Sequence, residues 1–122
     1  MNLTIKATGV DLTDSLRAYI DTKAAVLVKF LPKQASEIIA DLEIGRTTNH
    51  HKNGDVFKAE INITLPGEKM IREVVLEEDV YTAIDVLQDK VADRLSTLKD
   101  KRQSFVKRGA RTLKNLLRGF GK

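Results

Sequence analysis

The order in which apolar residues recur along the chain limits its possible folds more than any other feature. Apolar residues occupy every second position in four segments, as in strands with one buried face, and every third or fourth position in two, as in amphipathic helices. The strand-like segments are 2–8, 38–44, 57–65 and 70–76, and the helix-like segments are 12–30 and 80–98. The predicted order of elements is therefore β-α-β-β-β-α.

Turn and capping residues separate these segments. Asp11 or Thr13 can cap the first helix, which Pro32 stops. The polar segment 47–54 predicts a hairpin loop, and the acids at 77–79 open the second helix at its positive end. Four strands that are each apolar on one face need a single cover, which two amphipathic helices supply. We expect an α+β fold, a four-stranded sheet with two helices packed on one face.

The composition excludes several classes of protein. The 122 residues include no cysteine, which excludes disulfides, thiolate metal sites and a cysteine nucleophile. The N-terminus lacks a charged start followed by a long apolar run, so we expect no signal peptide. No apolar stretch approaches the roughly 20 residues that span a bilayer. We expect a soluble, cytoplasmic protein with one domain.

The charge is divided unevenly along the chain. Residues 1–100 carry 13 Lys/Arg and 17 Asp/Glu, whereas residues 101–122 carry 8 Lys/Arg and no acid. This division is typical of a globular body with a basic appendage that binds a polyanion. A solvated tail that only aids solubility is the alternative interpretation.

The second helix also sorts its charges onto separate faces. On a helical wheel at roughly 100° per residue, three basic residues lie beside the apolar stripe and four acids lie opposite them. The basic ridge consists of Lys90, Arg94 and Lys101, and the acids are Asp85, Asp89, Asp93 and Asp100. Like charges four residues apart lose the energy of ion pairing along the helix, so a partner for the basic side is worth proposing. An ordinary solvated face explains the pattern equally well.

Lys23 lies in the middle of the apolar stripe of the first helix. A lysine there packs its stem and lifts its ammonium group into water. We expect this group to emerge between the two helices, near the basic ridge.

Several stretches resemble the ribosome hibernation-promoting and ribosome-associated inhibitor proteins. Segment 78–85 (EDVYTAID), continued by Asp89-Lys90 and by 99–101 (KDK), is similar to the second-helix signature of that family. Segment 12–20 looks like its first helix, and 55–65 looks like its third strand. The resemblance covers residues 1–102 and implies a fold similar to double-stranded-RNA-binding domains.

The resemblance also implies a partner and a site. It implies binding to the small ribosomal subunit and its 16S-type rRNA, in the decoding region between head and body, where mRNA and tRNA are then excluded and idle ribosomes are preserved under stress. The chain departs from the family pattern at Asp93-Arg94 and Thr97, which rearranges the ridge. The residues expected to contact rRNA are Lys90, Arg94, Lys99, Lys101, Arg102, Lys23 and Arg17.

Residues 103–122 follow the expected domain of residues 1–102 as a basic tail, which we expect to be flexible. Lys107, Arg108 and Arg111 are its expected RNA contacts. Apolar residues at helical spacing allow a short basic amphipathic helix, whereas three glycines favour disorder until the tail meets rRNA. A membrane-surface helix is a weaker alternative, because the apolar face is short.

Other functions have less support in the sequence. His50, His51 and Asp55 are possible metal ligands, but neighbours on a hairpin loop rarely hold a defined geometry, so we expect no metal, cofactor or small-molecule substrate. No nucleophile motif is present, and we expect no enzyme activity. A generic duplex-RNA module would bind phosphate where the acids of 77–79 repel it. A protein–protein interaction module stays open as an alternative, and we expect a monomer without affinity for membranes.

Overall fold

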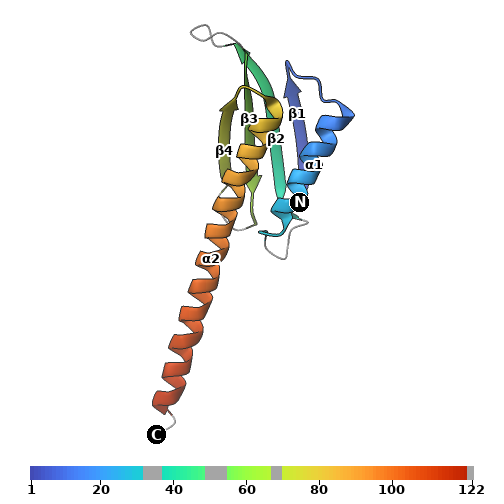
Figure 1. Cartoon of the computed structure of the whole chain (residues 1–122). Coiled ribbons are helices and arrows are strands. Elements are labelled where there is room, and N and C mark those ends of the chain that lie inside the picture. The colour runs from blue at the N-terminus through green and yellow to red at the C-terminus, as the bar shows by residue number, and fades with distance from the viewer. Residues whose placement is uncertain (32–36, 49–54, 67–69, 121–122) are drawn as a thin grey trace.

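The structure, a computed structural model, describes the backbone of residues 1–31, 37–48, 55–66 and 70–120, and their side chains except at 48, 55 and 102–120. One layer is a four-stranded sheet, and the other consists of two helices on one face of that sheet (Figure 1). The elements are β1 (Asn2–Thr8), α1 (Asp14–Val28), β2 (Ile39–Thr48), β3 (Asp55–Thr64), β4 (Ile71–Glu77) and α2 (Val80–Phe120). The predicted fold class and element order are confirmed.

The strands lie in the sheet in the order in which they occur in the chain, β1-β2-β3-β4. β1 pairs parallel with β2, because α1 forms the crossover between them, and the other two pairs are antiparallel. The register pairs Leu42 with Ile61 and Ile44 with Ala59. Residues that alternate in the sequence therefore share one buried face.

Each helix is capped at its N-terminus by the side chain of the residue that precedes it. The Thr13 hydroxyl accepts a hydrogen bond from the Leu16 amide at 3.1 Å, which makes Thr13 the N-cap of α1. A carboxylate oxygen of Asp79 accepts from the Thr82 amide at 3.0 Å at the start of α2. Asp79 thus caps α2 from outside its first turn, and Glu77 is the last residue of β4.

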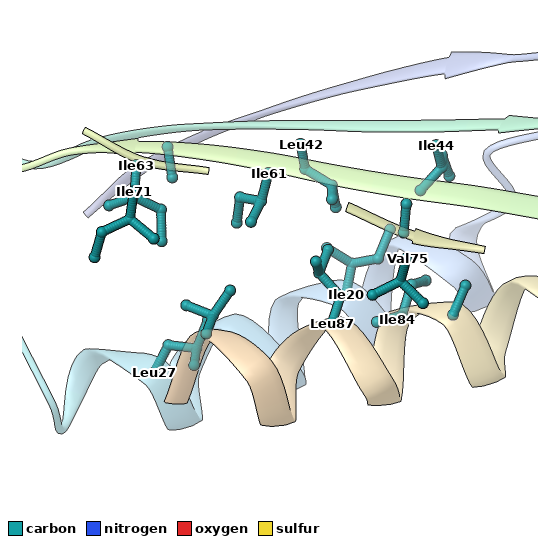
Figure 2. Packing of buried hydrophobic residues seen from close by; sticks show 14 of the residues in the cluster. Ile20, Leu27, Leu42, Ile44, Ile61, Ile63, Ile71, Val75, Ile84 and Leu87 are labelled. Atoms are coloured by element: carbon teal, nitrogen blue, oxygen red, sulfur yellow. The ribbon is translucent and has the colours of Figure 1, made fainter. Parts of the chain in front are cut away.

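The core lies between the sheet and the two helices (Figure 2). Ile44 and Ile63 from the strands are fully buried, as are Val91 and Leu95 from α2. Leu27 of α1 is 4% exposed and lies on the helix side of the core, across from Ile63 and Ile71 of the sheet. The apolar stripes of both helices therefore face the sheet, as their periodicity predicts.

α2 is much longer than the sheet that it covers and projects far past it toward the C-terminus (Figure 1). Its backbone passes the predicted domain boundary at residue 102 without a break. The expectation that 103–122 is flexible stays a prediction, because a helical backbone does not measure motion. Within the described residues, neither helix has an apolar stretch suited to crossing a bilayer.

Candidate nucleic-acid interface

The two long sides of α2 have different neighbours. On one side Arg94 donates a hydrogen bond from Nη1 to the Glu73 carboxylate at 3.0 Å and to the Arg72 carbonyl at 3.1 Å, both on β4. On the other side Asp85 accepts from the Tyr19 hydroxyl and pairs with Lys23 at 3.1 Å, both on α1. The β4 side and the α1 side of α2 are therefore separate surfaces.

The basic ridge lies on the β4 side, beside an open cleft. Glu73, Lys90, Asp93, Arg94 and Thr97 line this cleft, so its charge is mixed rather than uniformly positive. Arg94 is held by Glu73, whereas Lys90 is exposed and forms no ion pair with any described residue. Of the two, Lys90 is the cation that is available to a phosphate.

Lys101 extends the ridge along α2 and is also exposed without an ion pair to a described residue. Lys99 and Arg17 are exposed and equally lack such a pair. Lys99 lies about 180° around the helix from Lys90, at roughly 100° per residue, so it belongs to a different face.

Four predicted contacts lie where side chains are not described. Arg102, Lys107, Arg108 and Arg111 belong to the helical backbone of α2, but their side chains fall outside the described residues. His50 and His51 fall outside the described residues altogether, as does the side chain of Asp55.

Lys23 does reach the space between the helices, but the expectation that it lies near the basic ridge is wrong. Its Nζ is 3.1 Å from a carboxylate oxygen of Asp85. Asp85 and Lys90 lie about 140° apart around α2 at roughly 100° per residue. Lys23 therefore lies on the α1 side of α2 and is not a neighbour of the basic ridge.

Four side chains form what we call the inter-helix cluster: Tyr19, Lys23, Tyr81 and Asp85. The Tyr19 and Tyr81 rings meet edge to face with centroids 5.0 Å apart, and the Lys23 Nζ lies 5.3 Å from the Tyr19 centroid. The hydrogen bond from Tyr19, with help from Lys23, holds the pKa of Asp85 below its ordinary value. The hydrogen bond with Asp85 raises the pKa of Lys23. Both groups are therefore charged at neutral pH.

Sequence reasoning missed this cluster. Tyr19 reads as one more apolar-stripe residue, and Asp85 as one more member of the acidic face. The available signal was Lys23, a lone cation inside an apolar stripe, but a lysine at such a position is expected to extend its ammonium group into water rather than toward an acid.

On the face of the sheet that the helices leave open, charged side chains pair with one another. Glu60 on β3 is 8% exposed and accepts hydrogen bonds from Arg72 of β4 at 2.6 and 3.1 Å. The Lys58 Nζ lies 4.0 Å from the same carboxylate. The hydrogen bonds from Arg72 lower the pKa of Glu60. Arg72 and Lys58 are therefore less available to an RNA backbone than the lysines of α2.

Comparison with known proteins identifies the relatives of this chain. Residues 3–103 match the family described as Sigma 54 modulation protein / S30EA ribosomal protein. The ribosome hibernation promoting factor of Salmonella typhimurium is 30% identical over 106 residues, which cover 83% of this chain and 96% of that protein. The ribosome hibernation promotion factor of Picosynechococcus sp. is 28% identical over 101 residues, 83% of this chain. This chain spans about half the length of the Picosynechococcus protein, with 50% of it covered.

Solved structures show the same fold. The N-terminal domain of Protein Y from Thermus thermophilus has a TM-score of 0.65 and 24% identity, covering 80% of this chain and 99% of that one. A ribosomal subunit interface protein from Coxiella burnetii has a TM-score of 0.59 and 26% identity, covering 82% and 99%. The resemblance drawn from the sequence is confirmed, and the chain belongs to the Sigma 54 modulation protein / S30EA ribosomal protein family.

Proposed function

We propose that this protein is a ribosome hibernation factor that binds the small ribosomal subunit and inhibits translation without catalysis. Its relatives carry the name ribosome hibernation promoting factor. The site would be the decoding region between head and body, where the protein would exclude mRNA and tRNA. It would act in the cytoplasm as a monomer, with 16S-type rRNA as its main contact.

One observation carries the proposal beyond the family name. Three exposed lysines of α2, Lys90, Lys99 and Lys101, have no ion pair with a described residue. They lead into residues 101–122, where eight Lys/Arg occur without an acid. Cations without internal partners are the ones that can neutralise phosphates and release counterions. Arg17, on α1, is a further exposed candidate.

The start of α2 argues against a generic duplex-RNA module. The Asp79 carboxylate already accepts a hydrogen bond from the Thr82 amide at 3.0 Å, and the Thr82 hydroxyl donates to the same oxygen at 3.2 Å. A phosphate at this helix end would have to displace a carboxylate of the same charge. The protein would therefore favour the folded surface of a ribosomal subunit over an ordinary RNA duplex.

Sedimentation through sucrose with purified subunits tests the proposal. The protein should travel with small subunits at low salt and be released as salt rises, because the contacts are to phosphates. It should also lower protein synthesis in a purified translation system and compete with mRNA for the small subunit. Failure to travel with small subunits or whole ribosomes at any salt would contradict the proposal. Equal affinity for a plain RNA duplex would instead indicate the generic module.

A further inference from the structure

The inter-helix cluster has no role in the proposed function, yet it presents an exposed aromatic ring beside a partly exposed carboxylate. Tyr81 is 37% exposed. An edge-to-face contact occupies at most one face of each ring, so Tyr19 leaves Tyr81 a second face. Unpaired bases in RNA stack on such tyrosine faces.

Asp85 supplies the polar half of this surface. Its contacts with Tyr19 and Lys23 are both made through Oδ1. Its side chain is 45% exposed, and Oδ2 has no partner among the described residues. Asp85 lies four residues after Tyr81, which makes the two side chains neighbours on one face of α2.

The charge around this surface selects a base over a phosphate. Glu78 and Asp79 lie at the nearby start of α2, and the Lys23 ammonium is already paired with Asp85. A carboxylate oxygen accepts hydrogen bonds and repels phosphate oxygens. Among the RNA bases, guanine presents two adjacent N–H donors, at N1 and N2, on its Watson–Crick edge.

The adjoining pocket does not compete for this role. It lies between α1, α2 and the sheet, its lining side chains are mostly apolar, and its volume is about 30 Å³. A base is far larger and would lie over the surface of the helices instead.

We propose that the inter-helix cluster binds one unpaired guanine of RNA, which stacks on Tyr81 and donates its N1 and N2 hydrogens to Oδ2 of Asp85. Lys23 and Tyr19 are positioning residues, because they hold the Asp85 carboxylate through Oδ1 and leave Oδ2 without a partner among the described residues. The inference rests on the proposed function only in taking RNA as the natural ligand.

The intrinsic fluorescence of the two tyrosines can report binding at this site. It contains two tyrosines and no tryptophan, and both tyrosines belong to the cluster. Titration of the full chain with the RNA pentamers UUGUU, UUAUU and UUUUU can therefore be followed by tyrosine fluorescence. We expect UUGUU to quench the signal most and to bind roughly fivefold or more tightly than the other two.

Three variants make the titration specific. Tyr81→Leu should lose the quenching and the preference for guanine, whereas Tyr81→Phe, followed by NMR shifts, should keep the preference because the ring remains. Asp85→Asn still offers a carbonyl oxygen to Tyr19 and Lys23 but turns an amide donor toward the base, so it should lose the preference for guanine. Thermal unfolding of each variant checks that the fold is intact.

A second measurement uses the ribosome itself. A reagent that modifies N1 and N2 of unpaired guanine should find one guanine of the small-subunit rRNA protected by the native protein. Tyr81→Leu and Asp85→Asn should lose that protection while still sedimenting with small subunits. Equal pentamer affinities with no protected guanine would overturn the inference and leave the proposed function standing. Guanine preference without sedimentation would support the inference and contradict the proposed function.

Discussion

At the scale of single residues, the charges of α2 fall into those held by the fold and those left to a partner. Arg94 is held by Glu73 and by a carbonyl of β4, and Asp85 by Tyr19 and Lys23. Lys90 is exposed without an ion pair to a described residue. Ionic contacts with RNA should therefore depend on Lys90 more than on Arg94.

Lys90→Ala and Lys101→Ala should each weaken binding to small subunits. Each should lower the slope of log affinity against log salt by about one unit, if each lysine neutralises one phosphate. Folding should change by no more than about 0.5 kcal/mol, because both side chains are exposed. The measurement is sedimentation over a range of salt concentrations.

Lys6→Ala is the matched control, since Lys6 is an exposed lysine on β1, away from α2. It should leave the salt slope unchanged. Slopes that fall equally for all three variants would indicate that only total charge matters, and no ridge contact would be supported.

Asp85 also predicts a dependence of stability on acid. Its pKa is lower in the folded chain than in the unfolded one, where it is about 3.9. Below that value the unfolded state binds the proton first, so the Asp85 contribution to stability is complete at neutral pH and is lost as pH falls through the folded pKa.

Asp85→Asn should therefore lower the free energy of unfolding at pH 7 and flatten its decline as pH falls below about 4. Urea unfolding at several pH values measures both effects. Asp89→Asn serves as the control, because Asp89 is an exposed acid of α2 without an ion pair to a described residue. A decline as steep as in the native protein would contradict the role of Asp85.

At the scale of elements, Arg94 joins α2 to the edge strand β4. Its hydrogen bond to the Arg72 carbonyl satisfies a backbone group of the edge strand. Its ion pair with Glu73 is a second contact between α2 and β4. Arg94→Ala should lower the free energy of unfolding by about 0.5–1 kcal/mol, since the pair is partly exposed. A double-mutant cycle with Glu73→Gln, measured by urea unfolding, checks whether the two side chains are coupled; independent effects would contradict the link.

The elements themselves were predictable because each depends on local periodicity. The strands alternate, and the stripe from Ile84 to Leu95 repeats at helical spacing, so the burial of both follows from the sequence. Which element flanks each side of α2 was not predictable. A helical wheel gives the angle of Lys90 or Asp85 around its own axis, but the positions of β4 and α1 depend on long-range packing. This is why Lys23 was assigned to the wrong side.

At the scale of the whole molecule, the chain divides into a packed body and a projecting basic helix (Figure 1). Leu95 is the last buried residue whose side chain is described, and every acid precedes residue 101. Stability therefore comes from one part of the molecule, and the net positive charge from another, because residues 1–100 carry more acids than bases.

Removing residues 103–122 should leave the melting temperature nearly unchanged and weaken binding to small subunits, since it removes six Lys/Arg. Circular dichroism of the full chain and of the shortened chain shows whether residues 103–122 are helical or flexible in solution. The helical signal should fall by about a third if α2 is helical to Phe120 in solution, and little if the segment is flexible, as the sequence predicts. A shortened chain that melts much earlier would place part of the core beyond residue 102.

The order of the strands has a consequence for how quickly the chain finds its fold. Every strand pairs with its neighbour in the sequence, and only a few residues separate β2 from β3 and β3 from β4 along the chain. Closing short loops costs little entropy, and folds with mostly local contacts fold fast. The meander can therefore form before α1 brings β1 alongside β2. Substitutions in the β2–β3 pairing should slow folding, and those in β1 should mainly speed unfolding.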